Sequence, residues 1–501
     1  MNHTPGVMMN TQTRFHKLIH AALPFLLIAM LILTSLGASA FYEPAPGLAP
    51  AASAQDTLDG LTLADVLGVQ SIAPSHFTSG GSTVKTAGAN FVHFGIEWDD
   101  LAPGNPEDPP IEPADYNWTA YDTQMDLAAS LGFEIMITMG HNPMWAASFR
   151  RGPVDCVPLT RFTDYVSAVV TRYSAPPYNV KFWALYNEPD VVGFTRPGFT
   201  DCSGDSWAYG FGDEGVEYNG LNGPEHYAAH LQAAYNTIKA IDADAVVMNG
   251  GVAYDSFVSE GGYFNEDFLD LIFTAGAGNY MDAMNFHFYP QHAPRWETLT
   301  GLPGVMGKTQ AIRDIMTTHG LEKPFVCSEL GESSGYGGSD PRTEDTQAIV
   351  VVKQFTRAVA AGNMIGIWYN MNDYPDPIAF GEHGLLDYPS FSAKPSLDAL
   401  ETLATLWPGF EFTGVLSNTE MGATNLEGYL FWDQPGGEAL YILWSADGSA
   451  QTITLPPGVT AVVDKFNDPV TYSSTLDIDE QPVLITRDVT FHLLYLPMIS
   501  R

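Results

Sequence analysis

Eight short apolar segments alternate with amphipathic segments between residues 60 and 406, and this alternation restricts the possible fold more than any other feature. The amphipathic segments carry apolar residues at three- and four-residue spacing, and several have a glycine directly after them, as helices do. Strands that alternate with helices predict parallel β/α units. The apolar segments are residues 68–74, 90–98, 133–140, 180–189, 245–251, 283–290, 324–331 and 365–370.

Eight β/α units are the number that closes a (β/α)8 barrel, the TIM barrel, whose usual size of about 250 residues grows with long loops. A doubly wound open sheet is the alternative fold. A glycine-rich phosphate loop after the first strand would favour that sheet, and the sequence has none there. We therefore predict an α/β barrel domain over residues 59–408.

The sequence pattern changes after Phe410. Segments such as EGYLFWDQPGGEALYILWS alternate apolar and polar residues around Pro-Gly and Gly-Gly turns. This alternation is typical of half-buried antiparallel strands. We predict a small C-terminal antiparallel β-sandwich domain over residues 409–497, followed by a short tail at 498–501.

The N-terminus has the pattern of an export signal. Basic residues within positions 14–17 precede an apolar run at 21–36, and the small-residue sequence GASA follows. A retained signal anchor is the alternative, but the run is short for a membrane span. We predict a signal peptide at 1–40 and a linker at 41–58, so the protein is expected to be secreted and free of the membrane after cleavage.

The charge of the chain limits its partners. The formal net charge is −37, which disfavours nucleic acid and anionic membrane surfaces because both would repel the protein. No cysteine or histidine spacing matches a metal site, so no metal and no cofactor are expected. Acidic loops could hold calcium, but their spacing matches no known calcium loop, and we interpret them as solvated.

Three cysteines are present. Cys156 and Cys202 lie in the segments after the third and fourth predicted strands, and a barrel places such loops side by side. Because the expected compartment permits oxidation, we predict a Cys156–Cys202 disulfide. Cys327 lies in an apolar segment and is expected to remain a free, buried thiol.

Polar and aromatic residues follow the predicted strands at their C-terminal ends, where a barrel carries its working residues. Aromatic faces stack on sugar rings, carboxylates and amides bind hydroxyl groups, and two carboxylates that flank a bond are what glycoside hydrolysis requires. The strand-end residues are Glu97, Trp98, His141, Asn142, Trp145, Asn187, Glu188, His287, Tyr289, Glu329 and Trp368.

Two of these residues are the candidate catalytic carboxylates. Pro189 removes a ladder N–H and turns the chain out of the barrel, which leaves Glu188 at the rim. Glu329 ends the apolar segment 324–331. Glu332 is the alternative second carboxylate, although the apolar run has already ended before it.

The segment WALYNEPD, residues 183–190, resembles the W-x-x-x-N-E-P signature on strand 4 of glycoside hydrolase clan A, whose members retain anomeric configuration. The resemblance implies that Glu188 is the acid/base. PFVCSELG resembles the strand 7 pattern of the clan, which implies that Glu329 is the nucleophile. MNFHFYP and GIWYN resemble strands 6 and 8. The expected substrate-binding residues are Asn187, His287, Tyr289, Trp368, His141, Asn142 and Trp145.

Within the clan, the chain resembles family 39-like or cellulase-like (family 5-like) members. His93 stands where the clan commonly has arginine, and Leu330 stands where family 39 usually has an aromatic residue. The resemblance implies a retaining hydrolase of oligosaccharides or polysaccharides, similar to β-xylosidases, β-glucosidases or cellulases. An inactive carbohydrate-binding barrel is the alternative. The aromatic-rich segment 195–222 is expected to wall the positive subsites.

Overall fold

The computed structural model describes residues 52–104, 111–193, 210–215, 219–335, 342–374, 381–433 and 436–489. The predicted signal peptide, the predicted tail, Cys202 and most of segment 195–222 lie outside these residues. Within the described ranges, no helix is long and apolar enough to cross a membrane.

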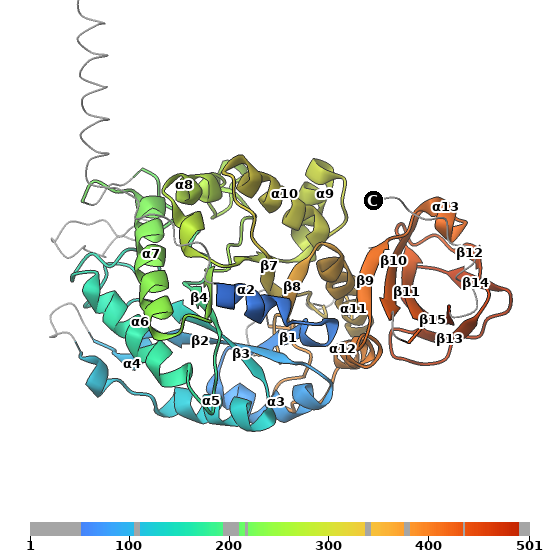
Figure 1. Cartoon of the computed structure of the whole chain (residues 1–501), viewed down its shortest axis with the longest axis horizontal. Coiled ribbons are helices and arrows are strands. Elements are labelled where there is room, and N and C mark those ends of the chain that lie inside the picture. Colours follow the sequence, from blue (N-terminus) through green and yellow to red (C-terminus); the bar gives the residue numbers. More distant parts are fainter. Residues whose placement is uncertain are drawn as a thin grey trace, which may run out of the picture. The chain divides into compact units, whose positions relative to one another are not determined.

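Eight parallel strands form the predicted barrel (Figure 1). β1 pairs with both β2 and β8, and the bridges Met248–Ala283 and Val252–Phe286 join the two ends of the sheet at β5 and β6. The fold is therefore the TIM barrel that the alternation of segments predicts. The strands are β1 (Leu67–Gln70), β2 (Phe91–Glu97), β3 (Glu134–Gly140), β4 (Phe182–Leu185), β5 (Val246–Asn249), β6 (Met284–Phe288), β7 (Phe325–Leu330) and β8 (Asn363–Trp368).

Amphipathic helices follow the strands and bury their apolar faces against the barrel. Local signals set their ends: Asn222 and Glu225 form a capping box at the start of α7, and Gly132 ends α5 in the left-handed conformation. The helices are α3 (Pro74–Thr86), α4 (Trp98–Leu101), α5 (Thr119–Leu131), α6 (Thr160–Tyr173), α7 (Gly223–Ile241), α8 (Phe268–Thr274), α9 (Ala293–Thr300), α10 (Val305–Thr318), α11 (Glu344–Ala360) and α12 (Pro395–Leu406).

A further helix, α2 (Ala52–Asp59), includes the last residues of the predicted linker. Ala54 and Leu58 of this helix are buried in a cluster with residues at the N-terminal ends of the strands, among them Phe91 and Phe182. The helix therefore covers the end of the barrel opposite the strand ends that carry the candidate site. In such barrels, residues at that opposite end contribute to stability, and catalytic residues lie at the C-terminal ends of the strands.

The residues after the barrel form antiparallel β-sheets, as the alternating pattern predicts. One sheet has five strands in the order β13-β15-β11-β10-β9, and a second sheet pairs β12 with β14. Apolar residues of both sheets share one core. The elements are β9 (Glu411–Val415), α13 (Asn418–Met421), β10 (Leu426–Asp433), β11 (Glu438–Ser445), β12 (Gln451–Thr454), β13 (Val459–Asp464), β14 (Thr475–Ile478) and β15 (Val483–Asp488).

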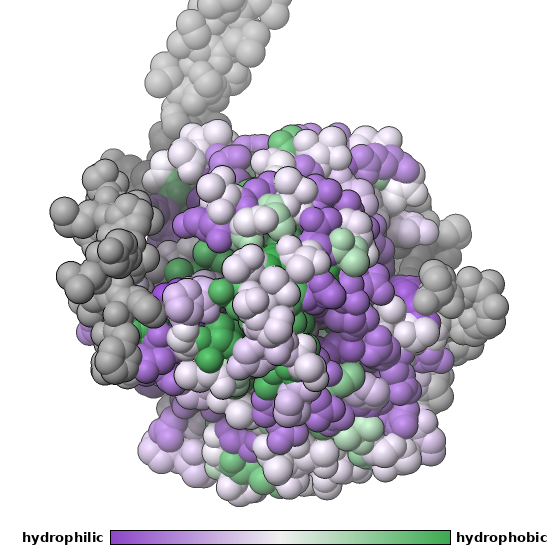
Figure 2. Space-filling view, turned by 90° about the vertical axis from the view of Figure 1, so that its right-hand side faces the viewer, coloured by the Kyte–Doolittle hydropathy of each residue, from purple (hydrophilic) through white to green (hydrophobic). Residues whose placement is uncertain are grey.

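The surface agrees with the acidic, polar composition of the chain. Figure 2 shows hydrophilic residues over most of the face that it presents, with apolar residues gathered in a smaller area near the middle.

The structure describes two of the three cysteines, Cys156 and Cys327. Cys327 is a free, buried thiol in β7, as predicted, and burial raises its pKa. Cys156 is disulfide-bonded. Because Cys202 lies outside the described residues, the pairing of these two cysteines stays a prediction.

An ion pair joins the barrel to the β-sheets. Arg357 of α11 donates from Nε to Oε2 of Glu427 in β10 at 3.0 Å, and the two side chains are only 12% and 14% exposed. The hydroxyl group of Tyr429 also donates to Glu427, at 2.9 Å. Both charges are thus largely removed from water and depend on each other.

We expect Arg357→Met to lower the free energy of unfolding by about 3–5 kcal/mol, because Glu427 would remain buried without its cation. Unfolding in guanidinium chloride measures this loss. Arg161→Met is the matched control: its partner Glu112 is 61% exposed, and such surface pairs contribute at most about 1 kcal/mol. Equal losses in both variants would contradict the prediction.

Candidate active site

Glu188 lies where the chain leaves β4. Tyr186 and Glu188 have positive φ angles of 64° and 47°, so the backbone turns sharply out of the strand direction. The N–H of Glu188 donates to the carbonyl oxygen of Gly251 at 3.0 Å, which ties this turn to the segment after β5. The carboxylate of Glu188 is therefore held at the barrel rim, 23% exposed.

Asp190 braces the same turn. Its buried carboxylate accepts the backbone N–H groups of Ala253 and Tyr254 at 3.1 and 2.6 Å. Burial raises the pKa of Asp190 to about 7, although both N–H donors oppose the rise. The loops after β4 and β5 thus support each other beside Glu188.

Glu329 lies in β7 and is 6% exposed. Its Oε2 accepts a hydrogen bond of 2.6 Å from the hydroxyl group of Tyr289, which follows β6. A register shift between β6 and β7 at Phe286 and His287 brings His287 opposite Glu329. Neighbouring strands therefore place a phenol and an imidazole against this carboxylate.

His287 connects the two carboxylates. Its Nδ1 lies 3.3 Å from Oε1 of Glu188 and 3.3 Å from Oε2 of Glu329. Since both neighbours are carboxylate oxygens, we assign the proton to Nδ1 as the donor. The three interacting atoms all lie within 4.8 Å of one another.

The pKa values of these groups are coupled through His287. Burial raises the pKa of Glu329, and the charge of Glu188 adds to the rise while His287 and Tyr289 oppose it. Burial also acts to raise the pKa of Glu188, but His287 and Arg151 outweigh it and leave this pKa below its usual value. Burial lowers the pKa of His287, and both carboxylates more than reverse this effect.

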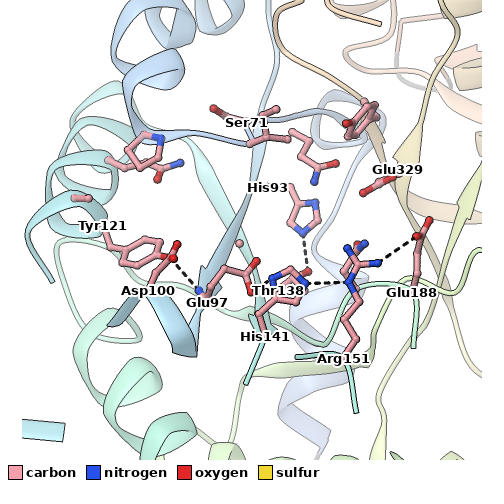
Figure 3. A pocket seen from close by; sticks show the side chains of 18 of the residues that line it. Ser71, His93, Glu97, Asp100, Tyr121, Thr138, His141, Arg151, Glu188 and Glu329 are labelled. Atoms are coloured by element: carbon pink, nitrogen blue, oxygen red, sulfur yellow. Dashed lines mark hydrogen bonds and ion pairs between the residues drawn. The ribbon is translucent and has the colours of Figure 1, made fainter. Parts of the chain in front are cut away.

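Arg151, in the loop after β3, is the cation beside Glu188. Its Nη1 lies 4.0 Å from Oε2 of Glu188, and its Nε donates to Nε2 of His141 at 3.2 Å. Nδ1 of His141 is 2.7 Å from Oε2 of Glu97. A chain of polar contacts thus runs from Glu97 through His141 and Arg151 to Glu188 (Figure 3).

His93 of β2 is uncharged. It is buried, and its Nε2 contacts the hydroxyl group of Thr138 at 2.7 Å. Burial and the charge of His287 lower the pKa of His93 to about 3. The strand 2 position where the sequence resemblance implies an arginine therefore supplies no positive charge in this chain.

The two carboxylates open into a cavity of about 670 Å³ at the C-terminal ends of the strands. Figure 3 shows Glu188 and Glu329 at one end of it, and Tyr121 and Asp100 at the other. Residues on the cavity wall include Gln70, Ser71, Ile72, Pro74, His93, Gly95, Glu97, Asp100, Asn117, Ala120, Tyr121, Gln124, Thr138, His141, Arg151, Asn187, Glu188, Tyr289, Glu329 and Tyr369.

The structure brings most of the predicted site residues together. Asn187, His141 and Tyr289 line the cavity with both carboxylates. His287 is 1% exposed and lies behind the pair. Glu332, the alternative second carboxylate, instead accepts a hydrogen bond from Arg342 at 2.9 Å and is not among the lining residues.

Besides His287, three predicted substrate-binding residues, Trp368, Trp145 and Asn142, are not among the residues that line the cavity, and their role in substrate binding stays a prediction. Trp368 is fully buried and donates to the carbonyl oxygen of His383, so the next residue, Tyr369, lines the cavity in its place. Trp145 is buried against Trp98. The third residue, Asn142, has its amide bonded to the carbonyl oxygen of Gly152.

Arg151, Tyr369 and Gln70 are lining residues that the sequence interpretation did not identify. Gln70 ends β1, and the rule of strand ends could have selected it. To predict Tyr369 as a lining residue, one would need to know which of two consecutive aromatic residues, Trp368 or Tyr369, faces the cavity. Arg151 lies in a loop, ten residues after His141. A loop has no periodic hydrophobic pattern from which the direction of a side chain could be predicted.

Two groups among the described residues have the ligand types of a metal site: Glu188, His287 and Glu329, and also Glu97, Asp99 and His141. In each group a histidine nitrogen contacts a carboxylate oxygen at 2.7–3.3 Å. His287 thus contacts Glu188 and Glu329, and His141 contacts Glu97.

The family model described as cellulase, glycosyl hydrolase family 5, matches residues 68–374. A search of curated proteins finds no match.

Three solved structures share the fold. A family 39 glycoside hydrolase from the gut symbiont Bacteroides cellulosilyticus WH2 has 16% identity and a TM-score of 0.58, with 85% of this chain and 82% of that chain covered. The family 39 enzyme of Xanthomonas axonopodis pv. citri has 15% identity and a TM-score of 0.51, covering 85% and 96%. A bifunctional glucanase-xylanase from a metagenome library has 11% identity and a TM-score of 0.51, covering 86% and 97%.

We expect Gly251→Ala to displace His287, because an added Cβ would lie 2.0 Å from Nε2 of His287 and 2.7 Å from Oγ of Ser328. The variant should lose about 1–3 kcal/mol of unfolding free energy through overpacking. In its crystal structure, the contacts of Nδ1 to Glu188 and Glu329 should lengthen beyond 3.3 Å. Gly414→Ala, where nothing lies within 4 Å of the added Cβ, is the control. An unchanged His287 in the Gly251 variant would refute this expectation.

Proposed function

Because the chain belongs to glycosyl hydrolase family 5, the cellulase family, we propose that it cleaves O-glycosidic bonds of oligosaccharides or polysaccharides by a retaining double displacement. Family membership makes the protein a glycosidase with a carbohydrate substrate. The retaining course, the roles of the two carboxylates and the polymeric nature of the substrate are parts of our proposal.

The separation of the carboxylates carries the proposal. An oxygen of Glu188 and an oxygen of Glu329 lie within 4.8 Å of each other. Retaining glycosidases have carboxyl groups about 5–5.5 Å apart, whereas inverting enzymes need about 6.5–9.5 Å to admit a water molecule between carboxylate and sugar. The short separation favours direct attack by one carboxylate on the anomeric carbon.

In the first step, Glu329 attacks the anomeric carbon and Glu188 gives its proton to the leaving oxygen, which yields a covalent glycosyl-enzyme and a free alcohol. In the second step, Glu188 takes a proton from water as the water oxygen attacks the same carbon and Glu329 leaves. Tyr289 supports this exchange, because its hydroxyl group hydrogen-bonds Oε2 of Glu329.

The first step requires a proton on Glu188 and a charge on Glu329. The pKa shifts of the free site favour the opposite distribution. Nδ1 of His287 contacts both carboxylates at 3.3 Å. We propose that His287 gives its Nδ1 proton to Glu188 and takes one from Glu329, which leaves the imidazole unchanged. Esterification of Glu329 then removes its charge, and the pKa of Glu188 falls for the second step.

Retention is the first expected outcome. Proton NMR of the earliest product from an aryl glycoside should show the anomeric configuration of the substrate. Glu188→Gln should lower the rate on a substrate with a poor leaving group by about 10²–10⁴-fold, because general acid catalysis is lost. Glu332→Gln is the control, since Glu332 pairs with Arg342 away from the cavity. Net inversion would exclude the double displacement.

Arg151→Met should move the alkaline limb of the kcat/KM profile to higher pH. Arg151 helps to hold the pKa of Glu188 down, so its removal raises that pKa. Glu188 acts as an acid in the first step, and it then stays protonated, and active, to higher pH. The pH dependence of aryl glycoside hydrolysis measures the shift.

Arg150→Met is the matched control for this experiment, because Arg150 pairs with Asp99 at 2.6 Å and does not line the cavity. The alkaline limb of the kcat/KM profile of Arg150→Met should coincide with that of the wild type. A limb that stays in place in Arg151→Met, or moves to lower pH, would show that Arg151 does not control the protonation of Glu188.

We also propose that the protein is exported after cleavage of its N-terminal signal, on the basis of the basic and apolar segments at positions 14–36. Intact-mass analysis of protein from the growth medium should show a chain that begins after residue 40 or after the second Ala-Ser-Ala at 52–54. Protein found only inside the cell with residue 1 retained would contradict this proposal.

A further inference from the structure

Lys308 of α10 is a buried cation that has no role in the reaction proposed above. Its side chain is 0% exposed, and its ammonium group donates to the carboxylate of Asp255 and to the carbonyl oxygen of Ala253. Nζ of Lys308 also lies 5.5 Å from the centroid of the Trp296 ring. Because a lysine is almost never fully buried unless it is paired, these contacts keep the ammonium group inside the protein.

Residues 251–255 follow β5, and we call them the clamp segment. The carbonyl oxygen of Gly251 accepts the backbone N–H of Glu188 at 3.0 Å. The carbonyl oxygen of Val252 accepts the backbone N–H of His287 at 2.9 Å. The clamp segment therefore holds the backbone of the proposed acid/base and of the histidine that contacts both carboxylates.

The clamp segment reaches Glu188 a second time, through Asp190. The backbone N–H groups of Ala253 and Tyr254 donate to the buried carboxylate of Asp190 at 3.1 and 2.6 Å. The carbonyl oxygen of the same Ala253 accepts a hydrogen bond from Lys308. Since Asp190 comes two residues after Glu188, one short segment connects the ammonium group of Lys308 to the turn that carries Glu188.

The clamp segment has a strained conformation. Tyr254, and Ser256 directly after the segment, have positive φ angles of 44° and 42°. Such angles cost free energy in residues other than glycine and persist only where the surroundings impose them. Asp255 lies between these two residues. Its Oδ1 accepts the Nε1–H group of Trp296 at 2.7 Å, and its Oδ2 accepts from Lys308. Contacts at Asp255 therefore fix the segment where its backbone is strained.

We propose that Lys308 is a positioning residue for the proposed acid/base: its ammonium group holds the clamp segment, and the clamp segment holds the turn that carries Glu188. The inference rests on the proposed function, since it concerns Glu188 as the group that protonates the leaving oxygen. Lys308 is not among the residues that line the cavity, so it acts through the backbone and not on the substrate. A displaced Glu188 would transfer its proton more slowly, because the transfer requires hydrogen-bond distance.

Lys308→Met together with Asp255→Asn tests this role, since the double variant leaves neither charge buried without its partner. The value of kcat/KM reports the first step of the reaction. On aryl glycosides with a poor leaving group it should fall about 10- to 100-fold, because a displaced Glu188 protonates the leaving oxygen less well. On dinitrophenyl glycosides, whose leaving group departs without a proton, the loss should stay below about 3-fold.

Lys239→Met together with Asp282→Asn is the matched control. Lys239 donates to Asp282 at 2.8 Å and to the carbonyl oxygen of Ala245, and the two side chains are 11% and 2% exposed. Its Nζ lies 5.3 Å from the centroid of the Tyr235 ring, so the contacts match those of Lys308. Ala245 and Asp282 lie just before β5 and β6, at the end of the barrel opposite the cavity. The ratio of the two kcat/KM values should therefore equal that of the wild type.

Hydrogen exchange tests the same role without any substrate. The backbone N–H groups of Glu188, Ala253 and Tyr254 are all hydrogen-bonded in the contacts described above. In the Lys308 double variant they should exchange at least about 10-fold faster, because the clamp segment opens more readily. In the Lys239 double variant their exchange rates should equal those of the wild type.

Two results would overturn the inference. One is unchanged exchange of the three N–H groups in the Lys308 double variant. The other is an equal change of kcat/KM on both kinds of leaving group, including no change on either. If the wild type cleaves no glycoside, the proposed function fails by itself, and the exchange rates then decide whether Lys308 holds the turn that carries Glu188.

Discussion

Two carboxylates that approach within 4.8 Å in a largely buried site are the constraint on which the rest of the candidate site depends. Like charges at this separation repel each other strongly where water is excluded. The structure compensates from three sides: His287 contacts both carboxylates, Tyr289 donates to Glu329, and Arg151 lies beside Glu188. The partners therefore stabilise the close approach of the two carboxylates, and His287 and Arg151 lower the pKa of Glu188.

The barrel makes this approach possible. Glu188 and Glu329 are 141 residues apart in sequence, and closure of the sheet between β5 and β6 directs both toward the same end of the barrel. The helix α2 covers the other end, where Ala54 and Leu58 are buried. Stability and chemistry are thus concentrated at opposite ends of the strands, as is usual for this fold.

The electrostatic arrangement departs from the one that the sequence resemblance implies, with an arginine on strand 2. His93 occupies the strand 2 position as a neutral residue, because burial and His287 hold its pKa near 3. The positive charge near Glu188 comes instead from Arg151, which a loop supplies and which His141 orients.

The sequence by itself determined the barrel, the antiparallel sheets that follow it, and the two candidate carboxylates, because periodicity and strand ends are local properties of the chain. Only the tertiary structure decided which side chains meet. Trp368 and Tyr369 are consecutive aromatic residues, and the packing of the barrel buries the first and presents the second to the cavity. Arg151 reaches Glu188 through a loop. Loop direction and side-chain facing depend on contacts between distant segments, which no local pattern records.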